Sequence, residues 1–173
     1  MTDPDEEKIE ALEEKYLLGH ALSASELHVA GTLIISDSLR VASIACGAIL
    51  RDQSSEEELR QRAALRLEEL CQEYIKKDHR YKNELLVTLM LIPTSTLKSS
   101  RILEEFTYRA ASAKRFTLRV NAMSVLERLA RLGNEESIRR LTEALADPNE
   151  EVRRNARIYL ERIRRPSEGG SQQ

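Results

Sequence analysis

The clearest chemical signal in this sequence is a group of arginines near the C-terminal end. They fall on two segments with helical patterns and comprise Arg115, Arg119, Arg154 and Arg157. A guanidinium group presents several N–H donors in a flat fork that matches a carboxylate or a phosphate. We therefore predict that these four residues bind a protein partner whose surface is acidic. The alternative is that they are solvated residues that pair locally with acidic neighbours such as Glu127, Glu150 and Glu161.

Residue types that serve catalysis or metal binding are few and scattered. The histidines His20, His28 and His79 have no second ligand at helical spacing, and Cys46 and Cys71 form no Cys-x-x-Cys pair. The glycines do not form a phosphate-binding loop. The sequence therefore predicts a protein that is not an enzyme and that has no cofactor or metal. Both cysteines are expected to be small buried core residues.

The arginines belong to an internal repeat. Segment 114–131, KRFTLRVNAMSVLERLAR, aligns without a gap on segment 148–165, PNEEVRRNARIYLERIRR, so that Lys114 matches Pro148. Seven of the eighteen aligned positions are identical. We call the separation of Lys114 from Pro148 the repeat offset. An offset of 34 residues, from 114 to 148, is typical of stacked helical units, each of which buries its apolar stripe against its neighbours.

Hydrophobic periodicity predicts nine helices and no strand. Ser23 and Glu26 have capping-box spacing, Gly133 suits a left-handed helix end, and Asp147 and Pro148 are expected to open the last helix. The expected helices lie at about 4–18, 23–35, 37–51, 55–77, 79–92, 96–111, 113–132, 135–146 and 148–165. After the first helix they pair into hairpins over 23–51, 55–92, 96–132 and 135–165. We predict a single domain over 1–165 and a disordered tail over 166–173.

Composition supports an all-α protein with an aliphatic core, since 41% of residues are apolar, only 4% are aromatic and Trp is absent. The net charge of −2 is unevenly divided: residues 1–99 carry 12 basic and 18 acidic side chains, and residues 100–173 carry 15 and 11. This polarity could steer an acidic partner toward the C-terminal half. Asp37 and Arg40 interrupt the most apolar stretch, 27–50, which predicts a buried hairpin and not a membrane span. An acidic N-terminus and two lone cysteines predict a cytoplasmic protein.

The last repeat resembles a HEAT repeat. Its first helix ends in Leu-x-x-Ala-Leu-x-Asp-Pro, and its second reads Val-Arg-x-x-Ala-x-x-x-Leu-x-x-Ile from Val152 to Ile163. The resemblance covers 113–165 most clearly and implies a right-handed α-solenoid of about four HEAT-like hairpins plus an N-terminal helix. In this family the second helices line a concave surface, and a ladder of Asp and Arg side chains joins neighbouring repeats. The resemblance thus implies structural roles for Asp147 and Arg153, whereas the turn around Ala113 has no Asp.

The leading hypothesis is a non-enzymatic protein–protein interaction module, or scaffold, that presents a curved helical surface to a protein partner. A second hypothesis is DNA or other nucleic-acid binding through the basic C-terminal half, although a chain without Trp offers few platforms for bases. A third, from fold analogy alone, is a HEAT-like lyase that attaches bilin pigments. No membrane partner is expected. The sequence leaves open the oligomeric state and whether the arginines or the N-terminal hairpins form the binding surface.

Overall fold

The computed structural model describes residues 4–75 and 81–165. Within these residues the chain is all-α, as predicted, with ten α-helices, one short 3₁₀ helix and no strand. Two compact units, Met1–Phe106 and Thr107–Gln173, are described separately, and their boundary falls inside α7. The helices are α1 (Pro4–Leu18), α2 (Ala24–Leu33), α3 (Leu39–Arg51), α4 (Glu57–Tyr74), α5 (Tyr81–Leu91), α6 (Thr94–Ser99), α7 (Arg101–Ala111), α8 (Phe116–Arg131), α9 (Glu135–Glu143), η1 (Ala144–Ala146) and α10 (Glu150–Arg164). The predicted tail, 166–173, lies outside the described residues.

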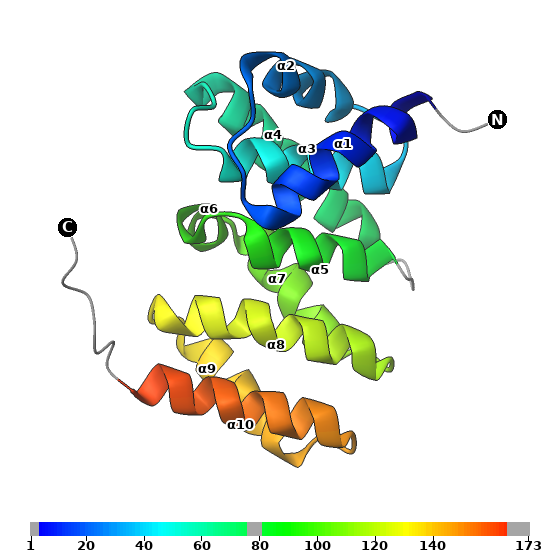
Figure 1. Ribbon diagram of the computed structural model, residues 1–173. Helices are drawn as coiled ribbons and strands as arrows, with labels where there is room; N and C mark the ends of the chain where they lie inside the picture. Colours follow the sequence, from blue (N-terminus) through cyan, green and yellow to red (C-terminus); the bar gives the residue numbers. More distant parts are fainter. Residues whose placement is uncertain (1–3, 76–80, 166–173) are drawn as a thin grey trace. The chain divides into compact units, whose positions relative to one another are not determined.

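Helix α3 is the centre of the first unit. Every residue from Val41 to Leu50 is buried, and α1, α2, α4 and α5 all contact this helix (Figure 1). A helix that is covered on all sides needs an apolar sequence on all sides, which accounts for the long apolar stretch. In the part of the chain that is described, no helix has the length and apolar character needed to cross a bilayer.

Tyr16 of α1 lies directly against Gly47 of α3. A Cβ atom at position 47 would lie 2.5 Å from the Tyr16 hydroxyl oxygen, so glycine leaves the room that the ring needs. The Tyr16 hydroxyl also donates to the carbonyl oxygen of Thr88 on α5, at 3.5 Å. At the end of α3, Arg51 donates to the carbonyl oxygen of Tyr16, beside the turn at Gly19, where φ is +74°. These contacts join the C-terminal end of α1 to the C-terminal half of α3 and to α5.

The second unit is built on α8 and α10, which lie side by side, with α9 in contact with both (Figure 1). Its buried core consists of Met123, Leu126, Ala130, Leu141, Ala144, Val152, Ala156 and Leu160. Ala122 and Ala156, at equivalent positions of the two repeats, are fully buried. The hydroxyl oxygens of Ser124 and Tyr159 lie 2.8 Å apart and link α8 to α10. The two repeated segments thus form adjacent, packed helices.

The segment predicted as one helix over 96–111 forms two helices instead. The chain breaks at Ser100, whose hydroxyl oxygen accepts a hydrogen bond from the N–H of Leu103 at 3.3 Å. At the equivalent position of the last repeat, Asn134 caps α9 in the same way and accepts from the N–H of Ser137 at 2.8 Å. The prediction was wrong because a serine that caps a new helix interrupts an otherwise continuous apolar pattern. The repeat offset therefore also relates the first helices of the two repeats.

Helix pairing in the first unit follows the prediction only in part. Helices α2 and α3 contact each other, and the predicted capping box of Ser23 and Glu26 is present. Helix α4 packs mainly on α3 and touches α5 little, so the predicted hairpin over 55–92 is not a close pair. The packing of α4 on the fully buried helix α3 takes the place of the predicted pairing of α4 with α5. The single domain over 1–165 and the right-handed α-solenoid stay predictions.

Candidate binding surfaces

Arg119 is a structural residue that joins α8 to the turn before α10. Its Nε and Nη2 atoms donate to the two carboxylate oxygens of Asp147, at 2.7 and 2.9 Å. Its Nη1 atom donates to the carbonyl oxygens of Ala113 and Lys114, both at 2.8 Å. The Arg119 and Asp147 side chains are only 12% and 11% exposed. Its donors are engaged within the fold, and binding of a partner by Arg119 stays a prediction.

The same contacts hold Asp147 in its ionised form. Burial alone favours the neutral acid, but hydrogen bonds from the Arg119 side chain and the N–H of Asn149, with the charges of Arg119 and Arg153, outweigh it and lower the pKa of Asp147. With its oxygens so occupied, Asp147 does not cap α10 as predicted. Asn149 is the N-cap, and its side-chain oxygen accepts from the N–H of Val152 at 3.2 Å.

Arg153 is the equivalent of Arg119 in the last repeat and makes the same kind of contacts with backbone carbonyl groups. Its Nη1 atom donates to the carbonyl oxygens of Asp147 and Pro148, at 2.7 and 2.9 Å. These two carbonyl groups are equivalent to the pair that Arg119 binds. Asp147 and Arg153 therefore both stabilise the turn, as the resemblance implied. The arginine that binds the carboxylate of Asp147 is Arg119 of α8.

The other three predicted residues, Arg115, Arg154 and Arg157, are exposed. Arg115 is the N-cap residue of α8, and its side chain makes no capping hydrogen bond. Arg154 lines an open hollow of about 500 Å³, together with Phe116 and the first residues of α10. Phe116 is 43% exposed there. Of the predicted set, these three arginines remain available to a partner.

Arg154 and Arg157 occupy positions that are apolar in the preceding repeat. Their equivalents on α8 are Val120 and Met123; Met123 belongs to the buried core, and Val120 packs against it. On α8 this face is covered by α9 and α10. The equivalent face of α10 is exposed and carries Arg154 and Arg157. The expectation, from the family resemblance, that these arginines lie on a concave surface stays a prediction.

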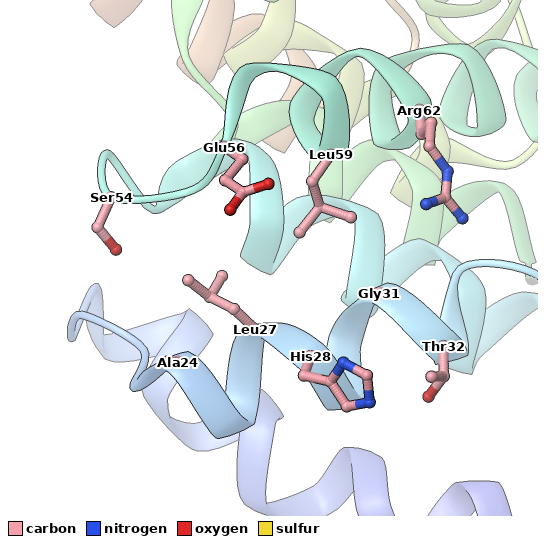
Figure 2. Close-up of a pocket in the computed structure, with 9 residues that line it drawn as sticks. All are labelled: Ala24, Leu27, His28, Gly31, Thr32, Ser54, Glu56, Leu59 and Arg62. Carbon is pink, nitrogen blue, oxygen red and sulfur yellow. The ribbon is translucent and has the colours of Figure 1, made fainter.

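A groove between α2 and α4 was not predicted from the sequence. It has a volume of about 590 Å³. Leu27 of α2 and Leu59 of α4 point toward each other across it (Figure 2). Gly31 lies on α2 where a Cβ atom would be 3.3 Å from the Cδ1 atom of Leu59, so glycine keeps the two helices close. The groove therefore has an apolar centre.

Polar side chains flank this apolar centre. Ser54 and Glu56 lie at one end of the groove, and Arg62 and Thr32 lie at the other (Figure 2). His28 also lines the groove and is exposed. The buried residues of α2 are Ala30 and Leu33. Leu27 and Gly31 are four residues apart on another face of the helix, and this spacing was a signal for a second contact surface.

The two cysteines are core residues, as predicted. Cys46 of α3 and Cys71 of α4 are fully buried on helices that pack together. Burial raises the pKa of Cys46 to about 12, and burial with the nearby Cys46 raises the pKa of Cys71 well above its usual value. Among the described residues, no three His, Cys, Asp or Glu side chains gather as metal ligands. His79 lies outside the described residues.

No protein-family model and no curated protein sequence matches this chain. Among solved structures, a crystal structure of an engineered protein, structural-genomics target OR329, is similar over 94% of this chain and 92% of its own. The sequence identity is 16% and the TM-score is 0.45. A likeness this remote carries no conclusion about function.

Proposed function

We propose that this protein is a non-enzymatic protein–protein interaction module and that the groove between α2 and α4 binds a segment of its partner. The observation that carries this proposal is the open apolar centre at Leu27 and Leu59, flanked by polar side chains. A small apolar area rimmed by polar groups is the usual form of a peptide-binding surface. The buried thiols favour a reducing compartment, and we propose the cytoplasm as its location.

The charges of the groove define the segment that fits it. One apolar side chain of the partner would lie between Leu27 and Leu59. A carboxylate of the partner would lie near Arg62, and a cationic group would lie near Glu56, since these two charged groups line opposite ends (Figure 2). Complementary charges at the rim mainly set orientation and association rate, and apolar burial at the centre supplies affinity.

We also propose that the repeats are HEAT-like and that they form a right-handed α-solenoid. Three features support this: the constant repeat offset, the buried small residues Ala122 and Ala156, and the pairing of Arg119 with Asp147 of the following turn. Scaffolds of this kind present long helical surfaces to other proteins, which is consistent with a binding role.

Site-specific photo-crosslinking in native cell extract tests the groove. A benzophenone side chain at exposed position 28 should give one discrete adduct, and Leu27→Glu in the same protein should reduce its yield several-fold. The matched control is benzophenone at position 65 of α4, where Leu65 is 61% exposed and does not line the groove. Equal adducts at both positions, or an adduct that Leu27→Glu leaves unchanged in a normally folded protein, would contradict the proposal.

A further inference from the structure

Arg153 presents donors that its counterpart in the preceding repeat uses to hold a carboxylate. Arg119 uses Nη1 for two backbone carbonyl groups and the Nε and Nη2 edge for the carboxylate of Asp147. Arg153 uses Nη1 for the two equivalent carbonyl groups. The Arg153 side chain is partly exposed, and its guanidinium group is held at Nη1 while the Nε and Nη2 edge has no acceptor among the described residues.

The exposed residues near this edge include two arginines, and Glu150 and Glu151 lie on the first turn of the same helix. Arg154 and Arg157 lie on the same helix and are exposed, at positions equivalent to Val120 and Met123 on the covered face of α8. Leu145, at 40% exposure, and the partly buried Ile163 lie at positions equivalent to Ala111 and Leu129 of the preceding repeat. We name Arg153, Arg154 and Arg157 the α10 basic face. Its charge selects an acidic partner, and the open edge selects a planar, two-oxygen acceptor.

We infer that the α10 basic face is a second binding site, at which Arg153 holds an aspartate or glutamate carboxylate from an acidic segment of a partner protein through two parallel hydrogen bonds. The bonding mode is the one that Asp147 makes with Arg119. A fixed guanidinium loses little freedom when it binds, because two carbonyl groups already position it. The residues of this site lie on α10 and in the turn before it, so the site does not depend on the groove between α2 and α4.

An NMR titration of the arginine Nε–H signals in the full chain tests this inference. The probe is a blocked peptide with the sequence of residues 143–151, EALADPNEE, which contains the aspartate that Arg119 already binds. The Arg153 signal should shift and saturate, while the Arg119 signal should stay in place and report that the fold is intact. Replacing the aspartate of the peptide with asparagine and its three glutamates with glutamine should weaken binding about tenfold or more, as expected for loss of a charge-assisted bidentate pair.

Matched protein variants separate the open edge from general attraction. Arg153→Lys keeps the charge but loses the two-donor edge, and it should weaken peptide binding about tenfold. Arg157→Lys also keeps the charge and should change binding less than about twofold. Equal binding of the two peptides, no binding at all, or equal effects of the two variants would overturn the inference.

Two other occupants give distinct results. If inorganic phosphate at matched ionic strength moves the Arg153 signal as much as the peptide does, the site is a general oxyanion site and the carboxylate assignment is wrong. If the Arg153 signal moves with protein concentration in the absence of peptide, the occupant is a second copy of the chain, which also overturns the inference.

Discussion

Arg119 and Asp147, 28 residues apart, form a two-point ion pair that joins α8 to the turn in front of α10, with N···O distances of 2.7 and 2.9 Å. Asp147 at the same time accepts a hydrogen bond from the N–H of Asn149 and presents its own carbonyl oxygen to Arg153. Through its side chain and its carbonyl oxygen, Asp147 therefore links α8, the turn and α10.

This arrangement predicts unequal effects for the two equivalent arginines. Arg119→Ala leaves the poorly exposed Asp147 carboxylate without its cation and should lower the free energy of unfolding by about 2–4 kcal/mol. Arg153→Ala removes only two bonds to backbone carbonyl groups and should cost about 1 kcal/mol. Urea melts of both variants measure the difference, and equal midpoints would contradict it.

The lowered pKa of Asp147 predicts an acid-sensitive contribution to stability. A carboxyl group whose pKa is lower in the folded state stabilises that state above its unfolded pKa of about 3.9, and this contribution disappears as pH falls through the folded pKa. Asp147→Asn should therefore be less stable than the native chain near pH 6, and the gap should narrow below about pH 4. Urea melts at several pH values measure the gap. A constant gap at all pH values would show that Asp147 acts through its shape alone.

The difference in burial between neighbouring positions of α10 predicts a large and a small change in the free energy of unfolding. Ala156 is fully buried against α8, so Ala156→Leu should overpack the contact and cost roughly 1–3 kcal/mol. Arg157 is exposed, so Arg157→Ala should change the free energy of unfolding by less than about 0.5 kcal/mol. Equal urea midpoints for the two variants would be inconsistent with the helix phase described here.

The exposed arginines Arg115 and Arg154, which the sequence predicted as partner-binding residues, should govern the rate of partner association. Arg115→Glu combined with Arg154→Glu should slow capture of an acidic partner several-fold at low salt and leave the melting temperature nearly unchanged. The matched control reverses two exposed cations of the first unit, with Lys98→Glu and Arg101→Glu, and should have little effect. Stopped-flow or surface-based kinetics measure both rates. Association at the native rate would leave these arginines as a solvated face.

Features that depend on local pattern were predictable. The all-α class, the capping box at Ser23, the cap at Asn134 and the burial of Ala156 all follow from residue types at fixed spacings along one helix. Ser100 shows where this reasoning fails, because a single capping serine in an apolar pattern is consistent with a continuous helix. Only projection of the repeat offset from Asn134 back onto Ser100 marks that serine as a cap.

The candidate sites were harder to predict because they depend on contacts between distant segments. Arg119 and Arg154 have the same residue type in similar helices, yet one holds Asp147 and the other is exposed. They differ in helix phase, since Arg153 and not Arg154 is the equivalent of Arg119, and the carboxylate that Arg119 binds comes from a turn 28 residues away. The groove at Leu27 and Leu59 likewise forms because α2 and α4 both pack on α3. The spacing of Leu27 and Gly31 indicates a second contact surface on α2, but it does not specify that α4 lies there.

The location of the two cysteines gives the chain a built-in reporter. Both thiols lie in the first unit, fully buried with raised pKa values, and the sequence contains no others. A thiol reagent added under native conditions must wait until α3 and α4 separate, so the labelling rate measures the opening of that unit alone. The second unit can unfold without any signal in this assay. The native sequence thus permits the opening of the first unit to be followed without an engineered probe.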